Sequence, residues 1–404
     1  MKMAPCHSHD RECLDLIALY PKKYISGDRL PKKLLINASN LHIGGGVQVA
    51  SSLVTELAKM ESVLALDSFS VLISSEVDQN LRSAERGRKL SPTPFNLIKC
   101  DTSGFSSNSI PDSSDADVVF TVFGPLYKWF TPFKSIVGFA QSWVIYPDNE
   151  CYGLLPFTHR LKARLKFWIQ GQFFKRADVL VVELEHVKQG LVRVLGIPSE
   201  RIHVIHNCIS SIYLDDSMWQ PVDLPKVDGY LRLGFLGRNY VHKNTAIFPA
   251  IVAELDRKHG IKARVYVTFT DAEWAACTPE FRAVCINVGQ LTVAQCPSFY
   301  QALDAVVFPS LLECFSATPL ESMVMEKPLF ASDRPFNRDI CGTHAHYFDP
   351  FLPASAAQAI ARFFCFAPKN LAALRAAREH ALQFSNPRDR AEKYLALMTG
   401  ISNA

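Results

Sequence analysis

The sequence predicts an α/β protein with two doubly wound parallel sheets. Short apolar strands alternate with helices of amphipathic spacing along most of the chain, the pattern of parallel strands joined by crossover helices. A length of 404 residues is long for one domain and suits two. Residues 215–229, rich in Asp and Pro, separate two such alternating series and indicate a linker.

The first series begins with a strand at 33–38 and a helix at 47–60, where apolar residues recur with helical spacing. The segment from Asp101 to Asp115 is polar and rich in Ser, which predicts a loop. The remaining strands of this half are predicted at 68–74, 118–122, 135–139, 179–182 and 202–205.

The second series begins with a strand at 231–237, followed by a helix near 244–258. A separate helix is predicted at the end of the chain, at 387–400. The remaining strands are predicted at 263–269, 284–288, 304–308 and 328–331.

The composition is that of a globular protein without a general affinity for nucleic acid. Hydrophobic residues make up 48% of the chain and charged residues 20%, and the net charge is only +4. No apolar run is long enough to span a bilayer, and the first 33 residues lack the apolar core of a signal peptide. The eleven cysteines have no framework spacing, which favours reduced thiols in the cytosol.

Residues 1–33 predict a poorly ordered leader. This segment contains two cysteines and two histidines, but they lack the paired spacing of a zinc site, so we expect no metal there. These four residues are Cys6, His7, His9 and Cys13.

Two glutamates eight positions apart, Glu313 and Glu321, are the most informative pair in the chain. A buried strand ending in Phe-Pro-Ser at 308–310 precedes them, which puts Glu313 in a strand-to-helix loop where α/β proteins bind ligands. Glu321 falls on the opening turns of the next helix, whose amino end attracts phosphate. Carboxylates beside a phosphate site suit the hydroxyl groups of a sugar. The alternative is two surface acids near a helix start.

A loop with two cations follows the first strand of the second half. Arg238 and Lys243 can converge on one diphosphate if the loop curls before its helix, because Arg offers a fork of donors and Lys a point charge. Cations there stabilise the charge that a leaving nucleoside diphosphate gains as its bond to the sugar breaks. The alternative is two solvated surface cations.

A glycine-rich loop, residues 40–47, follows the first strand of the chain. Three glycines before a helix let the backbone approach a ligand closely, although the loop lacks the G-x-G-x-x-G pattern of dinucleotide sites. A plain tight turn is the alternative.

The pattern G-R-x4-K-N at 237–244, combined with E-x7-E at 313–321, resembles the retaining glycosyltransferases of family 4, which have the GT-B fold. The resemblance covers roughly residues 34–400 and implies two Rossmann-like domains facing across a cleft. It implies a leader at 1–33, an acceptor-binding domain at 34–206, a nucleotide-sugar-binding domain at 207–386, and a final helix at 387–404 that crosses back to the first domain.

The resemblance also implies roles for individual residues. Arg238 and Lys243 hold the diphosphate, Glu313 contacts the hydroxyl groups of the donor sugar, and these three form the catalytic set. Glu321 contacts the ribose of the nucleotide. The full donor-binding set is Gly45, Gly46, Gly237, Arg238, Lys243, Asn287, Gly289, Glu313, Phe315, Ser316 and Glu321.

Three residues of the first half are expected to contact the acceptor, namely His42, Gln141 and Trp143. A solvated histidine and a tryptophan packed in the core are the alternatives. Many family members have a cleft histidine near the position of Gln141, so a catalytic histidine is not expected here. The usual Pro and Gly around Asn207 are also replaced, by His206 and Cys208.

The expected function is retaining transfer of a hexosyl group from a nucleotide-sugar to a glycan or lipid-linked acceptor, in lipopolysaccharide, O-antigen or capsule assembly. No Asp-x-Asp motif occurs in a matching context, so neither a metal ion nor another cofactor is expected. The alternatives are a GT-B sugar-nucleotide epimerase and a non-catalytic sugar-nucleotide-binding protein.

Basic and aromatic residues interleave from Thr158 to Arg176 in a helix-compatible stretch. Such a stretch suits an anionic bilayer, and a solvated surface helix is the alternative. We therefore expect a cytoplasmic protein, peripheral on the inner face of the cytoplasmic membrane, with no nucleic acid partner.

Overall fold

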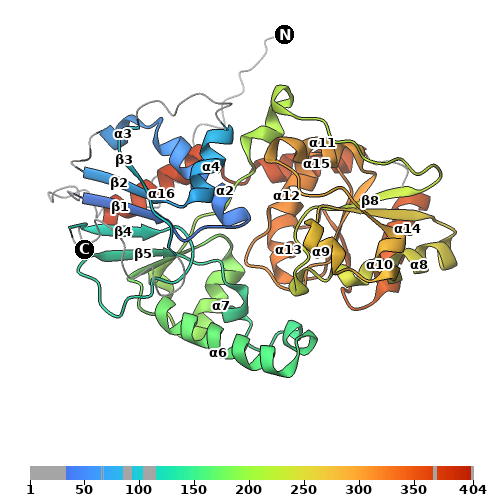
Figure 1. Cartoon of the computed structure of the whole chain (residues 1–404), viewed down its shortest axis with the longest axis horizontal. Helices are drawn as coiled ribbons and strands as arrows, with labels where there is room; N and C mark the ends of the chain where they lie inside the picture. The colour runs from blue at the N-terminus through green and yellow to red at the C-terminus, as the bar shows by residue number, and fades with distance from the viewer. Residues whose placement is uncertain are drawn as a thin grey trace, which may run out of the picture.

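The computed structural model describes residues 33–64, 66, 68–84, 93–102, 115–366 and 371–401, which form two parallel sheets flanked by helices (Figure 1). The strand order is β3-β2-β1-β4-β5-β6-β7 in the first sheet and β10-β9-β8-β11-β12-β13 in the second. Both orders reverse once, between β1 and β4 and between β8 and β11, so the predicted pair of doubly wound sheets is confirmed. The predicted leader, except Lys33, and most of the 101–115 loop lie outside the described residues.

The first domain alternates strands and helices from its first residue to β7. In chain order its elements are β1 (Lys33–Ala38), α2 (Gly45–Leu57), α3 (Glu61–Leu64), β2 (Ser68–Ile73), α4 (Ser75–Ala84), β3 (Asn96–Lys99), β4 (Val118–Thr121), β5 (Lys134–Gly138), α5 (Ser142–Ile145), η3 (Glu150–Leu154), α6 (Phe157–Phe174), β6 (Val179–Val182), α7 (Glu185–Leu195), η4 (Ser199–Arg201) and β7 (Ile202–Val204).

The rest of the chain continues the same alternation. It contains η5 (Ser211–Leu214), η6 (Asp216–Met218), β8 (Leu231–Phe235), η7 (Val241–Lys243), η8 (Thr245–Ile247), α8 (Phe248–His259), β9 (Ala263–Val267), α9 (Asp271–Ala275), α10 (Pro279–Val284), β10 (Cys285–Asn287), η9 (Val293–Gln295), α11 (Cys296–Ala302), β11 (Ala305–Phe308), α12 (Ala317–Val324), β12 (Leu329–Ser332), α13 (Pro335–Cys341), β13 (His346–Phe348), α14 (Pro353–Phe366), α15 (Leu371–Leu382) and α16 (Pro387–Ile401).

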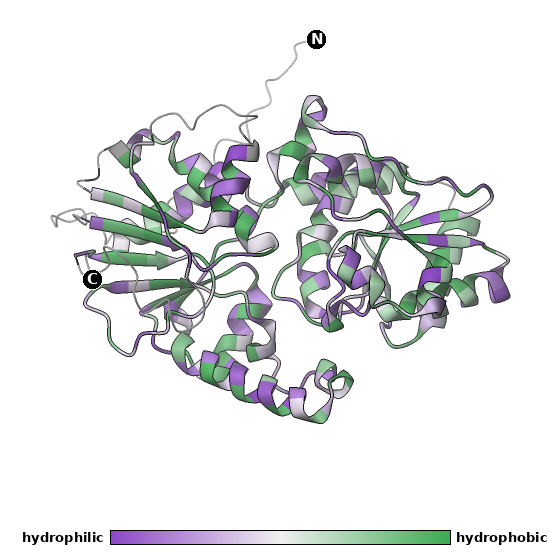
Figure 2. Ribbon diagram, in the orientation of Figure 1, coloured by the Kyte–Doolittle hydropathy of each residue, from purple (hydrophilic) through white to green (hydrophobic). Residues whose placement is uncertain are grey.

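The central strands are mostly apolar because helices cover both faces of each sheet and most of the strand side chains are buried. All four residues of β4 and all four of β11 are buried, and the strands of both sheets are mostly hydrophobic in Figure 2. The sequence analysis did not predict the edge strands β3 and β13. Each is short and begins with a polar residue, so neither forms an apolar run.

Residues 215–229 were predicted as a linker, but the segment packs on one domain. The segment lies against the second domain, where Leu224 is buried and Trp219 packs on the core. The backbone N–H of Gln220 donates to the carbonyl oxygen of Ala294 at 2.8 Å. The apolar residues among the Asp and Pro residues give the segment a surface to bury.

The last helix, α16, returns to the first domain, where it packs against α2 and β4 (Figure 1). The ring of Tyr394 lies 4.9 Å from the ring of Phe120, centroid to centroid. Arg390, also on α16, is almost fully buried and donates hydrogen bonds to the Asn207 side chain and to the Val49 carbonyl oxygen. The two chain segments that pass between the domains therefore meet at one buried guanidinium.

A buried carboxyl group, that of Glu183, lies close to this guanidinium. Burial raises the pKa of Glu183 from its ordinary 4.5 to about 7, although the charge of Arg390 and a hydrogen bond from Asn207 act in the opposite direction. Glu183 lies directly after β6, at the edge of the first sheet.

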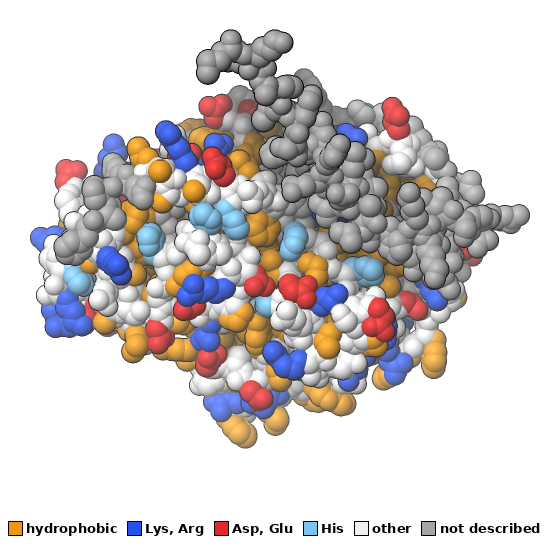
Figure 3. All heavy atoms as spheres, turned by 180° about the vertical axis from the view of Figure 1, so that it is seen from behind, with side chains coloured by type: hydrophobic (Ala, Val, Ile, Leu, Met, Phe, Trp, Pro, Cys, Tyr) orange, Lys and Arg blue, Asp and Glu red, His pale blue; other side chains and the backbone are white. Residues whose placement is uncertain are grey.

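The helix α6 lies along the lower edge of the first domain in Figure 1. Basic and hydrophobic side chains are mixed along the lower edge of the molecule in Figure 3. Within the described ranges, no helix is both long and apolar enough to cross a membrane.

The raised pKa of Glu183 predicts a pH-dependent stability. The folded state binds the proton more tightly than the unfolded state, so this group lowers the free energy of unfolding as pH rises from 4.5 to 7. Relative to Glu183→Gln, the free energy of unfolding of the wild type should fall by at most about 3.5 kcal/mol across this window, at about 1.4 kcal/mol per pKa unit. Urea unfolding of both proteins at pH 4.5 and 7.5 measures the difference, and a pH-independent difference would contradict the assignment.

Candidate donor site and interdomain cavity

The second sheet reverses its strand order between β8 and β11, which are hydrogen-bonded neighbours. The loops that leave the carboxyl ends of these two strands are joined to each other. The backbone N–H of Leu311 donates to the carbonyl oxygen of His242 at 2.7 Å, and the Ser310 hydroxyl donates to the same oxygen at 3.2 Å. A reversal of this kind is where open α/β sheets bind ligands.

The two joined loops bring Lys243 and Glu313 together. The Lys243 Nζ lies 2.6 Å from Glu313 Oε1, and the two side chains are only 15% and 11% exposed. The Ser310 hydroxyl donates to the same carboxylate oxygen at 2.5 Å. The ammonium also lies 5.3 Å from the centroid of the Phe308 ring, so the pair is held in a mostly dry setting. The low local dielectric strengthens its electrostatic interactions.

Arg238, in the same loop as Lys243, is fixed by a partner that the sequence analysis missed. Its Nε–H donates to both carboxylate oxygens of Glu273, at 2.8 and 3.0 Å. Burial raises the pKa of Glu273, but the backbone hydrogen bond from Thr270 and the bond from Arg238 outweigh it, and the pKa is lowered. This contact uses the Nε side of the guanidinium. The T-x-x-E pattern of Thr270 and Glu273 marks the start of α9 and was the signal in the sequence.

The glycines and the asparagine predicted for the donor site lie at the ends of neighbouring strands. The backbone N–H of Gly237 donates to the Thr268 hydroxyl at 3.1 Å. The side-chain oxygen of Asn287 accepts from the N–H of Phe269 at 2.9 Å and from that of Gly289 at 3.3 Å. Asn287 therefore ties together the ends of β9 and β10, and its side chain serves the loop structure.

Glu321 lies on α12 and is buried, with 9% of its surface exposed. Burial raises the pKa of Glu321, and hydrogen bonds from Tyr300 and Tyr213 oppose this shift. The Tyr300 hydroxyl donates to Oε2 at 2.8 Å. Phe315 and Ser316 form the turn into this helix. The two tyrosines were not predicted, because they come from distant segments.

In the first domain, the strand order reverses between β1 and β4, and the glycine-rich loop directly follows β1 at this point. The side-chain amide of Asn40 donates to the carbonyl oxygen of Phe123 at 2.8 Å and joins the loops after these strands. Gly44 has φ +72°, which favours glycine, whereas a Cβ at Gly45 would meet no atom within 4 Å. Gly45 and Gly46 form the first turn of α2, and at Gly45 the fold itself makes no steric demand for glycine.

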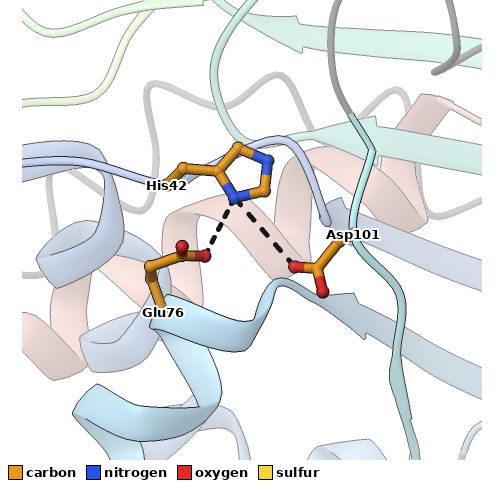
Figure 4. A group of neighbouring side chains, drawn as sticks. All are labelled: His42, Glu76 and Asp101. Atoms are coloured by element: carbon orange, nitrogen blue, oxygen red, sulfur yellow. Dashed lines mark hydrogen bonds and ion pairs between the residues drawn. The ribbon is translucent and has the colours of Figure 1, made fainter.

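Both ring nitrogens of His42 have partners in the protein, and Figure 4 shows Glu76 and Asp101 beside Nδ1. Nδ1 lies 2.8 Å from Glu76 Oε2, and Nε2 lies 2.7 Å from the carbonyl oxygen of Thr102. The hydrogen bond to Thr102 and then that to Glu76 raise the pKa of His42. Both partners can only accept when Glu76 is ionised, so both nitrogens carry protons. Contact of His42 with an acceptor, as predicted, therefore requires one of these bonds to break.

His42, Glu76 and Asp101 also have ligand atoms within 4.8 Å of one another. A metal ion bound there would have to displace the proton on Nδ1. The hydrogen bonds already satisfy that nitrogen, so the geometry favours an imidazolium held by carboxylates.

Gln141 and Trp143 lie at the start of α5, after β5. The Trp143 ring stacks on Phe167 with 5.3 Å between centroids and meets Tyr152 edge-on at 4.9 Å. Packing thus accounts for Trp143, as the alternative interpretation had it. Trp143 also contacts a small apolar cluster of Cys151 with Leu311 and Leu312, which brings the carboxyl edges of the two sheets together.

A cavity of about 410 Å³ lies between the domains next to this cluster. Arg334 of the second domain donates from Nη2 to Glu150 Oε1 of the first at 3.0 Å across it. The cavity adjoins the donor loop, since its wall includes the two leucines directly before Glu313. The principal polar and aromatic lining residues are Tyr146, Asp148, Asn149, Glu150, Arg193, Arg334 and Phe336. The sequence analysis did not predict this cavity, because its walls come from four separate segments.

Two sequence families match the chain. Residues 43–211 match the family described as Glycosyltransferase Family 4, and residues 231–365 match the family described as Glycosyl transferases group 1. The comparison with curated proteins found no match.

Solved structures share the fold at low sequence identity. A glycosyltransferase from Rickettsia africae is 16% identical with a TM-score of 0.65, and the match covers 92% of this chain and 98% of that one. HepE from Anabaena, solved with UDP and glucose, is 12% identical with a TM-score of 0.63, over 91% and 99%. Sucrose-phosphate synthase from Thermosynechococcus elongatus is 14% identical with a TM-score of 0.62, over 91% and 98%.

The hydrogen bonds of His42 predict that the pKa of its ring lies above 6.5 and that the stability of the protein depends on pH in this range. The folded state favours the protonated ring, so this contribution is present below pH 6.5 and is lost as pH rises through the raised pKa. Glu76→Gln should lower the pKa of His42, whereas Glu61→Gln, at an exposed position elsewhere, should not change it. NMR titration of the ring protons measures both. A wild-type pKa at or below 6.5 would refute the double hydrogen bond.

Proposed function

We propose a specific reaction for this chain, which belongs to the glycosyltransferases of group 1 and family 4 and has the GT-B fold. The proposed reaction moves a sugar from a nucleotide-sugar to a glycan or lipid-linked acceptor and retains the configuration of the donor sugar. It requires no metal ion. The process served is the assembly of lipopolysaccharide, O-antigen or capsule, on the cytoplasmic side of the membrane.

The observation that carries the donor site is the contact between Lys243 and Glu313 at the reversal between β8 and β11. A nucleoside diphosphate bound along the first loop meets the Lys243 ammonium and the guanidinium of Arg238. Both cations then stabilise the negative charge that the diphosphate gains as the bond to the sugar breaks. Because Glu313 touches Lys243, its carboxylate lies where the sugar adjoins the phosphate and can accept hydrogen bonds from the sugar hydroxyl groups.

Glu321 is proposed to hold the ribose of the nucleotide. It lies in α12, five residues after the N-cap Ser316, and its tyrosine partners fix the carboxylate. HepE from Anabaena was solved with UDP and glucose, which makes UDP-sugars the first donors to test here.

The acceptor is proposed to enter the interdomain cavity. Asp148, Glu150, Arg193 and Arg334 line it with opposite charges that balance, next to the aromatic Tyr146. Neutral polyols suit such a wall, because carboxylates accept from hydroxyl groups, guanidinium groups donate to them, and an aromatic face packs on a sugar ring. The cavity wall includes Leu311 and Leu312, directly before Glu313, so an acceptor held there is proposed to approach the donor sugar from the side of the first domain.

The two rival functions keep the same fold. An epimerase would need catalytic acids and histidines in the cleft and no separate acceptor site, and the combination of Arg238 and Lys243 with Glu313 argues against it. A non-catalytic protein would bind the sugar nucleotide without turnover. Release of labelled sugar from a nucleotide-sugar donor separates that rival from the transferase.

Arg238→Ala and Lys243→Ala should each reduce kcat by about two to three orders of magnitude, the usual effect of removing one group that stabilises charge in the transition state. Lys262→Ala, an exposed lysine of the same domain, should leave kcat unchanged. Sugar transfer measured under saturating donor checks all three variants. Near-normal kcat in either loop variant, with the fold intact, would remove the diphosphate assignment.

Sugar transfer should continue in excess EDTA. The positive charges proposed at the donor site are side chains, which chelation does not remove. The measurement is the initial rate with and without EDTA, followed by addition of magnesium or manganese. Activity that disappears in EDTA and returns only with one of these ions would show a metal requirement.

The product should keep the anomeric configuration of the donor sugar. This rests on the family to which the chain belongs and not on the geometry of the residues. NMR of the first product formed, before any equilibration, reads the configuration directly. An inverted linkage would exclude the proposed stereochemistry while leaving the donor site untouched.

A further inference from the structure

The helix α6 has two apolar faces, and only one of them is packed. On the inner face, Phe174 is fully buried and Phe167 stacks on Trp143. On the outer face, large apolar side chains project into solvent, with Phe157 75% exposed and Trp168 64% exposed. The complete outer row is Phe157, Leu161, Leu165 and Trp168.

The spacing of four, four and three residues puts this row along one side of the helix. Apolar side chains scattered singly on a surface need no explanation, but a continuous row over three turns marks an interaction surface. These four side chains are 57–75% exposed, so most of their apolar surface contributes nothing to the packing of the described residues, and a partner that covers the row lies outside them.

Charge narrows the identity of that partner. α6 contains four Lys and Arg residues and no acidic residue in its 18 positions. Lys162 and Lys166 each follow a leucine of the row and so lie on one side of it, whereas Arg164 lies on the other. Arg164 is already engaged, since its guanidinium packs on the Tyr152 ring and lies 3.7 Å from Asp148. The two lysines are exposed, with no acidic side chain beside them on the helix.

Two further exposed aromatic residues lie at the carboxyl end of α6. Trp129 packs against Phe173 at 5.1 Å between centroids, and the guanidinium of Arg176 lies 4.1 Å from the Trp129 ring. The neighbouring Phe130 is 91% exposed. Tryptophan and arginine side chains of this kind anchor proteins at the level of lipid headgroups.

We propose that the outer face of α6, formed by Phe157, Leu161, Leu165 and Trp168 with Lys162 and Lys166, docks on an anionic lipid bilayer. The helix lies parallel to the surface, its apolar row enters the headgroup boundary, and the lysines meet the lipid phosphates. This face combines an apolar row with lysines and has no acidic residue. A bilayer with anionic headgroups offers both an apolar layer and negative charge, whereas an acidic protein groove offers mainly the charge.

The docked orientation has a consequence for the acceptor, which rests on the proposed function. The interdomain cavity is lined by residues 145–150, directly before η3 and α6, and Arg164 of α6 lies close to Asp148 of the cavity wall. The docked helix therefore brings the cavity close to the membrane surface. A lipid-linked acceptor can then reach the cavity without leaving the bilayer.

The test measures binding of the whole protein to vesicles of phosphatidylcholine, with and without phosphatidylglycerol, by co-sedimentation. The wild type should bind the anionic vesicles, and the fluorescence of Trp168 should shift to shorter wavelength. Leu161→Ser with Leu165→Ser should weaken binding at least tenfold. The matched pair Leu352→Ser with Leu371→Ser, two exposed leucines of the second domain, should bind like the wild type.

Lys162→Gln with Lys166→Gln should weaken binding to anionic vesicles roughly tenfold or more and remove most of its salt dependence. A wild type that ignores anionic vesicles even at low salt would overturn the proposal. So would a dimer in solution that the Leu161 and Leu165 substitutions dissociate, since the face would then bind a second copy. Sugar transfer to a short soluble acceptor should persist in all these variants, so a failure of transfer and a failure of docking are distinguishable.

Discussion

The pairing of β8 with β11 is the constraint on which the rest of the proposed donor site depends. Gly234 of β8 suits the packing beside this pair, because a Cβ there would lie 2.0 Å from a side-chain carbon of Leu303 and would force that side chain to move. Once these strands are neighbours, the loops that follow them leave the same edge of the sheet. A cation 12 residues after the start of β8 and a carboxylate five residues after β11 then come within 2.6 Å. The sheet topology therefore brings together two loops that are far apart in the sequence.

The first domain supplies the residues that face the loops of the second domain. Its own strand reversal places the glycine-rich loop, the fixed imidazolium of His42 and the α5 segment at one edge. Contacts from this edge, through Cys151 and Glu150, reach the loops of the second domain. On the same domain, α6 presents its outer row of apolar side chains. The proposed acceptor cavity thus adjoins the loop of the proposed donor site, and the first domain also carries the proposed membrane face.

Both sheets could be predicted from sequence, because buried parallel strands are continuous apolar runs. The edge strands β3 and β13, which each begin with a polar residue, were missed because they do not form such a run. Lys243 and Glu313 could be predicted from their spacing in loops after strands. Glu273, Tyr300 and Arg390 could not, since each acts through a partner at least 21 positions away in the chain. From the sequence, α6 could be predicted only as a basic and aromatic helix. Apolar residues occur on both of its faces, so the sequence pattern does not show which face packs on the domain and which is exposed.

The most direct test of the central claim is a thermal-shift titration with UDP, GDP and ADP on the wild type and on Lys243→Ala. A ligand of the folded state at one hundred times its Kd raises stability by about 2.7 kcal/mol. The account predicts that at least one diphosphate raises the Tm of the wild type, and that the shift at equal concentration shrinks in the variant. A nucleotide that stabilises both proteins equally would show that the diphosphate binds away from the joined loops, and would contradict the proposed donor site.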